Sequence, residues 1–230
     1  MTHTPVDPPL PQCKEGTVRF IHINTGGICS KKKLVEFKLL LTSISQSQAD
    51  IYSVNEVNLD TTQVQIKRDL YDIGQTEIRH GQQFYSTSKE SYPRAFKPGG
   101  TMLGLAPHMA SRREDHGSDS KGRWTWVQLT GKHSKAILVI TAYRVSQTYP
   151  SEAGYSTAFM QQYRAYIKEN VSNPKPKHRI LLDLTTFITN WRSIHNNSSI
   201  IVMLDANGDT SDPHFSAFLA DTTLHDVVIH

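Results

Sequence analysis

The stretch "IIVMLDANGD" constrains the fold more than any other part of the chain. Five consecutive apolar residues, Ile200 to Leu204, run directly into Asp205 and Asn207. A short apolar run that ends at a turn signal such as Asn-Gly is typical of a buried strand. In an extended chain, residues two positions apart point the same way, so Asp205 and Asn207 can address one place together. The stretch therefore predicts a buried strand that ends in a polar site, and a plain turn is the alternative.

Strand-like and helix-like segments recur along the 230 residues. β-Branched and aromatic residues predict strands over 17–25, 49–59, 82–88 and 99–106, a hairpin over 123–145, and a last strand from 199. Apolar residues at helical spacing predict helices over 31–45, 155–170, 178–194 and 211–220. The polar, glycine-containing segment 109–122 predicts an exposed loop. This order favours a layered α/β sandwich with mixed sheets over a parallel doubly wound fold.

Two other apolar strands end in single polar residues, Asn24 and Glu56. Together with Asp205 and Asn207 they would bring two carboxylates and two amides to one rim of a sheet. Magnesium usually takes one or two protein carboxylates and keeps several waters or phosphate oxygens. These four residues therefore predict a site for a hard cation beside a phosphate. The alternative is that each residue only forms the turn at the end of its strand.

The sequence lacks the motifs of several other kinds of site. The residues after Asp205 miss the glycine and glutamate of an EF-hand loop, and the eleven histidines show no zinc spacing, so His22 is interpreted as a packed side chain. Neither a G-x-S-x-G elbow nor a P-loop is present, which argues against a serine hydrolase and a P-loop NTPase. The two cysteines do not form a disulfide framework. With no signal peptide and no apolar run of membrane-spanning length, we expect an intracellular protein, in the nucleus or the cytoplasm.

The charge pattern favours a polyanionic partner. The formal net charge is +4, and basic residues gather in and just after the predicted loop 109–122. We predict contacts with nucleic acid from Arg113, Arg123 and Arg144. A basic loop that is only solvated is the alternative.

Five short motifs resemble one superfamily in order and spacing, over about residues 18–227. They are "FIHINTGGI", "DIYSVNEVNL", "KPGGTMLG", "AILVITAYRV" and "IIVMLDANGD". Each is similar to a strand motif of the endonuclease/exonuclease/phosphatase superfamily, whose fold is called DNase I-like. The resemblance implies two mixed β-sheets packed together with helices outside.

The resemblance also implies a chemistry, metal-assisted hydrolysis of a phosphodiester. It assigns Glu56 to the metal-binding carboxylate for Mg²⁺ or Mn²⁺, with Asn24 supporting that site. It assigns Asp205 to the residue that orients or deprotonates water, Asn207 to phosphate binding, and Tyr143 to contact with the phosphate or the leaving oxygen. Within the superfamily, the middle of the chain is most similar to retroelement-type endonuclease domains. That similarity implies a monomer that acts on DNA, with a reverse transcriptase downstream in the parent protein.

The chain departs from the superfamily pattern in three places. Ile23 and Gly26 replace the tryptophan and second amide of the first motif, Asn55 replaces a glutamine, and no S-D-H motif follows Asp205. We therefore expect a disordered tail over 1–16 and a domain over 17–230 that lacks its last strands, with impaired activity. The alternatives are a phosphatase or phospholipid phosphodiesterase of the same superfamily, and a non-catalytic remnant that binds nucleic acid.

Overall fold

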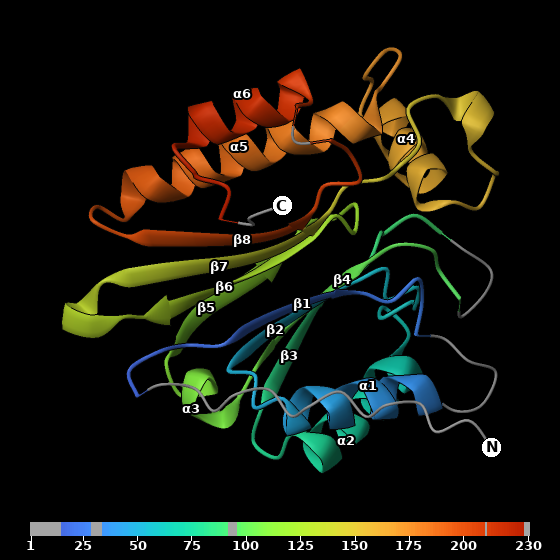
Figure 1. Ribbon diagram of the computed structural model, residues 1–230. Coiled ribbons are helices and arrows are strands. Elements are labelled where there is room, and N and C mark those ends of the chain that lie inside the picture. Colours follow the sequence, from blue (N-terminus) through green and yellow to red (C-terminus); the bar gives the residue numbers. More distant parts are fainter. Residues whose placement is uncertain (1–14, 29–33, 92–95, 210, 228–230) are drawn as a thin grey trace, which may run out of the picture.

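Two four-stranded sheets pack face to face, and helices cover both outer faces (Figure 1). The computed structural model describes residues 15–28, 34–91, 96–209 and 211–227. The predicted fold class, a layered α/β sandwich of two mixed sheets, is confirmed. Most of the predicted 1–16 tail lies outside the described residues. No helix in the described ranges is long and apolar enough to cross a membrane.

The first sheet has the strand order β1-β2-β4-β3. Its strands are β1 (Phe20–Asn24), β2 (Ile51–Asn55), β3 (Gln82–Ser86) and β4 (Thr101–Leu105). β1 and β2 are parallel, whereas β4 is antiparallel to both of its neighbours. Helices α1 (Val35–Gln46) and α2 (Val64–Glu77) cover the outer face, where α1 buries Phe37, Leu41 and Ile44, and α2 buries Leu70.

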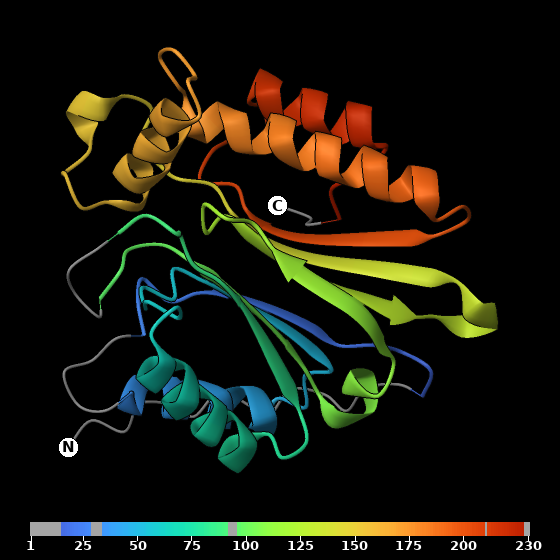
Figure 2. The same ribbon diagram turned by 180° about the vertical axis from the view of Figure 1, so that it is seen from behind.

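The second sheet has the order β5-β6-β7-β8, and its last pair, β7 and β8, is parallel. Its strands are β5 (Arg113–Ser118), β6 (Trp124–Thr130), β7 (Ala136–Tyr143) and β8 (Ser199–Asp205). Helices α5 (Pro176–Ile194) and α6 (Pro213–Thr222) cover its outer face (Figure 2). Asp212 caps α6 by accepting a hydrogen bond from the backbone N–H of His214, with Pro213 at the first position.

The inner faces of the two sheets share one apolar core. Ile51, Leu103 and Leu105 from the first sheet pack with Val127 and Val139 from the second, and all five are buried. This packing fixes how the ends of the strands in one sheet face the ends in the other. The edge that carries the polar residues is therefore built from both sheets.

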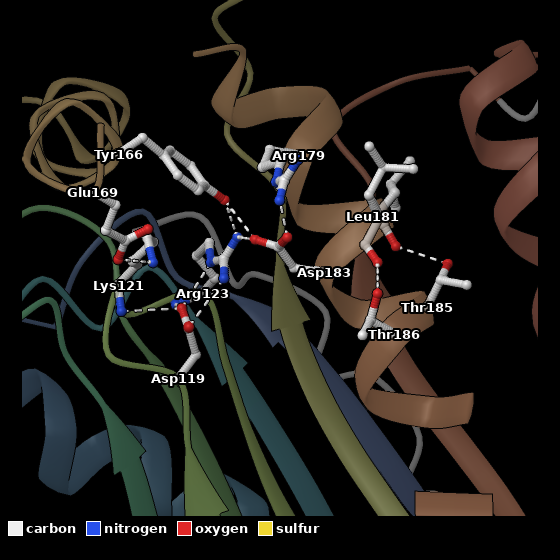
Figure 3. A network of polar contacts seen from close by, with 11 residues as sticks. Asp119, Lys121, Arg123, Tyr166, Glu169, Arg179, Leu181, Asp183, Thr185 and Thr186 are labelled. Carbon is white, nitrogen blue, oxygen red and sulfur yellow. Dashed lines mark hydrogen bonds and ion pairs between the residues drawn. The ribbon is translucent and has the colours of Figure 1, made fainter. Parts of the chain in front are cut away.

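A buried arginine joins the second sheet to helices α4 (Ala158–Lys168) and α5 (Figure 3). The Arg123 guanidinium donates to both carboxylate oxygens of Asp119, at 2.7 and 3.0 Å, and to Asp183 at 2.7 Å. The Tyr166 hydroxyl of α4 donates to the same Asp183 carboxylate at 2.7 Å. Because the charge is buried, matched and hydrogen-bonded on several sides, this network holds α4 in a defined position.

Two parts of the chain differ from the sequence-based expectation. Helix α2 was not predicted, because it fully buries only Leu70 and Gly74 and its other apolar residues are interspersed with charged and amide side chains. The predicted loop 109–122 contains the strand β5, which follows the short helix α3 (Pro107–Ala110). β5 is an edge strand with mostly exposed side chains, so its sequence carries no apolar alternation.

Candidate active site

Four polar residues meet where the parallel strands of the two sheets end. Asn24 ends β1 and Glu56 follows β2 in the first sheet, while Tyr143 ends β7 and Asp205 ends β8 in the second. In the strand register Tyr143 is the partner of Asp205, and Asn24 is the partner of the residue before Glu56. Parallel pairing thus brings the carboxyl ends of both strand pairs to one edge of the sandwich.

The Asn24 amide joins the two carboxylates across the sheets. Its Nδ2 atom donates to Glu56 Oε1 at 3.1 Å and to Asp205 Oδ2 at 2.6 Å. Its Oδ1 atom accepts from the Gly26 backbone N–H at 2.9 Å, which fixes the orientation of the amide. One donor therefore lies between two negatively charged groups, an arrangement in which a cation has a clear electrostatic advantage.

Glu56 holds an uncommon backbone conformation. Its φ is +54°, in the left-handed region that non-glycine residues rarely adopt. Such a conformation costs on the order of 1–3 kcal/mol and persists where the surrounding structure demands it. The strain is located at the residue whose carboxylate faces Asn24 and Tyr143.

Tyr143 is buried beside the two carboxylates. Burial raises the pKa of its hydroxyl well above the usual range, and the neighbouring charges of Glu56 and Asp205 raise that pKa further. Glu56 also accepts a hydrogen bond from the hydroxyl. Tyr143 is therefore a neutral hydrogen-bond donor at physiological pH.

Asn207 lies two residues after Asp205, in the loop that follows β8. Its backbone N–H donates to Asp205 Oδ1 at 3.3 Å, and its side-chain Nδ2 donates to the Arg144 carbonyl at 2.6 Å. The second bond uses one of the two amide hydrogens, so one remains free to donate. The loop after β8 therefore orients both Asp205 and an amide group toward the same edge.

A layer of polar side chains beneath the site was missed in the sequence. The His22 Nδ1 atom is 2.9 Å from the Ser53 hydroxyl, which also bonds to the Thr141 hydroxyl of the opposite sheet. Asn55 Nδ2 donates to the Ala142 carbonyl at 2.9 Å. These contacts fix β2 against β7, and hence Glu56 against Tyr143. The sequence signal for these contacts was Ser53, a polar residue in the middle of the buried strand β2.

The donor set fits a hard divalent cation. The site offers two carboxylates and two amides, and magnesium completes such a set with waters or phosphate oxygens. Among the described residues, no three His, Cys, Asp or Glu side chains are grouped so that they could hold a metal ion. An ion bound by Glu56 and Asp205 would need water or phosphate oxygens for its remaining ligands.

A pocket of about 190 Å³ opens beside the carboxylates. Its lining includes Glu56, Asn58, Tyr143, Gln147 and Thr157. Thr157 caps the helix α4. The network of Arg123 thus indirectly positions one wall of this pocket.

The predicted nucleic-acid contacts of Arg123 and Arg144 are not supported. Both guanidinium groups are buried, and Arg144 is 0% exposed, with Asp212 as its partner at 2.5 Å. Arg144 also donates to the Lys177 carbonyl at 2.8 Å. Each holds helices against the second sheet instead of facing solvent. Arg113 lies on β5, the edge strand farthest from β8 in that sheet.

Comparison with known proteins gives the fold. No family model and no curated protein matches the sequence. The solved structure of the 3' phosphatase NExo from Neisseria bound to product DNA hairpin matches 90% of this chain and 70% of its own, at 12% identity and a TM-score of 0.55. A beta hairpin deletion mutant of beta toxin from Staphylococcus aureus matches 92% of this chain and 75% of its own, at 12% identity and a TM-score of 0.52.

Two further solved structures match with lower TM-scores. An endonuclease/exonuclease/phosphatase family protein from Leptotrichia buccalis matches 89% of this chain and 74% of its own, at 10% identity and a TM-score of 0.48. The chain spans 60% of the length of the human Nocturnin catalytic domain. The chain therefore shares its fold with NExo and with beta toxin, which confirms the predicted DNase I-like fold.

Proposed function

We propose that this chain, with its DNase I-like fold, is a metal-dependent phosphodiester hydrolase that acts on DNA. The observation that carries the proposal is the Asn24 amide, which joins Glu56 and Asp205 across the two sheets at 3.1 and 2.6 Å. A structural turn at each strand end would not require these groups to converge from opposite sheets.

Glu56 would hold Mg²⁺ or Mn²⁺, and Asn24 would support that site through its hydrogen bonds to Glu56 and Asp205. The bound ion would neutralise charge that develops on the phosphoryl oxygens during hydrolysis. Glu56 keeps its strained backbone and its hydrogen bond with Tyr143, so its carboxylate is held in one orientation. Asn24 is fixed by the Gly26 N–H, which leaves its amide directed at both carboxylates.

The other residues act on water and on the phosphate. Asp205 accepts hydrogen bonds from Asn24 and from the Asn207 backbone, which orient its carboxylate as an acceptor for the hydrogen of an attacking water. Asn207 donates its remaining amide hydrogen to a phosphate oxygen. Tyr143, held neutral, donates its hydroxyl hydrogen to the phosphate or to the leaving oxygen.

DNA is proposed as the substrate on two grounds. The chain is basic, with a formal net charge of +4. In addition, its five motifs resemble the superfamily, with the middle segment similar to retroelement-type endonucleases. A phosphatase of the same fold is the second candidate, because the matched NExo structure is a 3' phosphatase bound to product DNA hairpin.

The test compares the chain with Glu56→Gln in hydrolysis of supercoiled plasmid, a DNA oligonucleotide carrying a 3'-phosphate, and bis-p-nitrophenyl phosphate. Each reaction is run with MgCl₂, with MnCl₂ and with EDTA. We expect cleavage only with a divalent ion, and a loss on the order of 10²–10³ in Glu56→Gln, the size seen when a preorganised electrostatic group is removed.

Glu36→Gln is the matched control, because Glu36 is exposed on α1 and is not one of the residues that meet at the site. It should cleave as the unaltered chain does. Robust hydrolysis by Glu56→Gln would refute the proposal. Release of phosphate from the 3'-phosphorylated oligonucleotide without plasmid nicking would instead favour the phosphatase.

A further inference from the structure

A second concave surface is lined by residues of α2, β3 and β5. In their sheets, β3 and β5 are the edge strands opposite β1 and β8. Figure 2 shows where these elements lie. Two adjoining cavities of about 500 and 390 Å³ form it, and they share five lining residues. These are Lys67, Gln83, Phe84, Tyr85 and His116. Because the cavities share walls, we treat them as one elongated groove, the α2–β5 groove.

The α2–β5 groove carries positive charge without compensating carboxylates. Lys67 and Arg113 line it, and no aspartate or glutamate lies among the described residues of its walls. No carboxylate forms an ion pair with either cation within the described ranges. The Arg113 guanidinium instead lies 5.8 Å from the centre of the Phe84 ring, and its Nη1 is 3.0 Å from His116 Nδ1. Two cations are therefore available to an anionic ligand.

Aromatic rings and amides alternate with these charges. Lys67, Tyr71 and Gln75 are four residues apart on α2, so they form one stripe along the helix face that lines the groove. The Tyr71 side chain is 62% exposed, a large ring open to solvent. Opposite it, the rings of Phe84 and His116 lie 4.7 Å apart.

Three polar atoms in the groove wall are buried without a partner in the described part of the chain. They belong to Gln82, Tyr85 and Arg113. An unpaired buried polar atom costs about 1–3 kcal/mol. Side chains in this wall therefore gain hydrogen bonds if they turn toward a polar ligand.

We propose that the α2–β5 groove binds single-stranded nucleic acid. Lys67 and Arg113 contact phosphates, the exposed ring of Tyr71 and the ring of Phe84 stack with bases, and the glutamine amides bond to base edges. Cations interleaved with aromatic rings are the composition that recognises an unpaired strand, whose base faces are open, whereas the bases of a duplex are already stacked. An acidic peptide would satisfy the charges but would leave the rings unused.

Binding is measured by fluorescence anisotropy with a short fluorescein-labelled oligothymidylate in EDTA. The test variant is Lys67→Glu/Arg113→Glu. The control is Lys132→Glu/Lys135→Glu, which makes the same charge change at the exposed β6–β7 turn. We expect at least about tenfold weaker binding in the test variant alone, and a salt slope reduced by roughly 1.4 for two lost phosphate contacts on a single strand.

Tyr71→Ala tests stacking separately from charge. It should weaken binding roughly fivefold to a hundredfold while the salt slope stays unchanged. Circular dichroism and thermal melting of each variant confirm that the fold is intact. Equal losses in the two charge-reversed variants, no effect of Tyr71→Ala, or competition by poly-glutamate as strong as by the oligonucleotide would each overturn the proposal.

The groove is independent of the proposed hydrolysis, and the two can fail separately. Lys67→Glu/Arg113→Glu should hydrolyse bis-p-nitrophenyl phosphate at the unaltered rate. Glu56→Gln should bind oligothymidylate with unaltered affinity. Binding of the oligonucleotide without hydrolysis would support the groove and reject the metal site. Hydrolysis without oligonucleotide binding at the groove would support the metal site and reject the groove.

Discussion

At the scale of single residues, the imidazole of His22 lies against Ser53 and near Asp205, although the residue as a whole is exposed on β1. Burial lowers the pKa of its imidazole below 6.5, although the charge of Asp205 acts to raise it. The unfolded chain therefore takes up a proton at a higher pH than the folded chain does. Between those two pKa values, and below them, protonation favours the unfolded state, so stability falls as the pH drops through 6.5.

His22→Gln should remove this part of the acid sensitivity, because glutamine can still bond to Ser53 but does not titrate. Chemical denaturation at pH 7.5 and pH 5 measures the free energy of unfolding at each pH. From pH 7.5 to pH 5 this free energy should fall more for the unaltered chain than for His22→Gln. His225→Gln, at an exposed histidine, is the control and should behave as the unaltered chain does. Equal falls for His22→Gln and the unaltered chain would contradict the prediction.

The sequence revealed individual site residues where position in a strand was the signal. Asn24, Glu56 and Asp205 were found because each follows an apolar run, and parallel strand ends meet at one edge. Arg123 and Arg144 were misplaced, because a positive charge in a sequence indicates a solvent-facing group unless its partners are known. Those partners, Asp183 and Asp212, lie 60 and 68 residues further along the chain.

At the scale of the elements, the Arg123 network connects a sheet with two helices. Arg123→Lys keeps the charge but loses the paired contact with Asp119 and the reach to Asp183. We expect the free energy of unfolding to fall by about 2–3 kcal/mol, the scale of lost hydrogen bonds to a buried charged group. Arg68→Lys on the exposed side of α2 should change it by less than about 0.5 kcal/mol.

Amide hydrogen exchange locates the effect. Faster exchange in α4 than in α1 is expected for Arg123→Lys, because the Tyr166 hydroxyl on α4 loses the hydrogen bond that the Arg123 guanidinium donates to it. Uniform acceleration over the whole chain would show that the network stabilises the molecule generally and does not hold α4 in particular.

A helix or strand could be predicted where the local sequence shows the alternation or run of apolar residues that its burial requires. β7 and β8 were found because continuous apolar runs form them, and α5 because its apolar face recurs at helical spacing. Helix α2 and strand β5 escaped because each exposes most of its surface. Their positions depend on packing against β3 and β6, which no local pattern encodes.

At the scale of the whole molecule, the candidate site connects the two sheets. Glu56 and Asn24 come from one sheet and Asp205 from the other, so an ion held there would tie the halves of the sandwich together. We expect Mg²⁺ or Mn²⁺ to raise the unfolding temperature. At a free concentration a hundred times the dissociation constant, the gain is about 2.7 kcal/mol.

Differential scanning calorimetry with and without EDTA measures this stabilisation. Glu56→Gln should lose it and Glu36→Gln should keep it, since only the first variant removes a proposed ligand. An equal ion-induced rise in both variants would place the stabilising ion elsewhere.

The left-handed backbone of Glu56 has an evolutionary consequence. Glycine adopts a φ of +54° without strain, so stability by itself favours glycine at position 56. Only a demand for the carboxylate opposes that preference. Among diverging copies of the gene, those no longer under selection for hydrolysis could replace this glutamate without destabilising the fold. Retention of Glu56 would therefore distinguish the copies that hydrolyse substrate from those that do not.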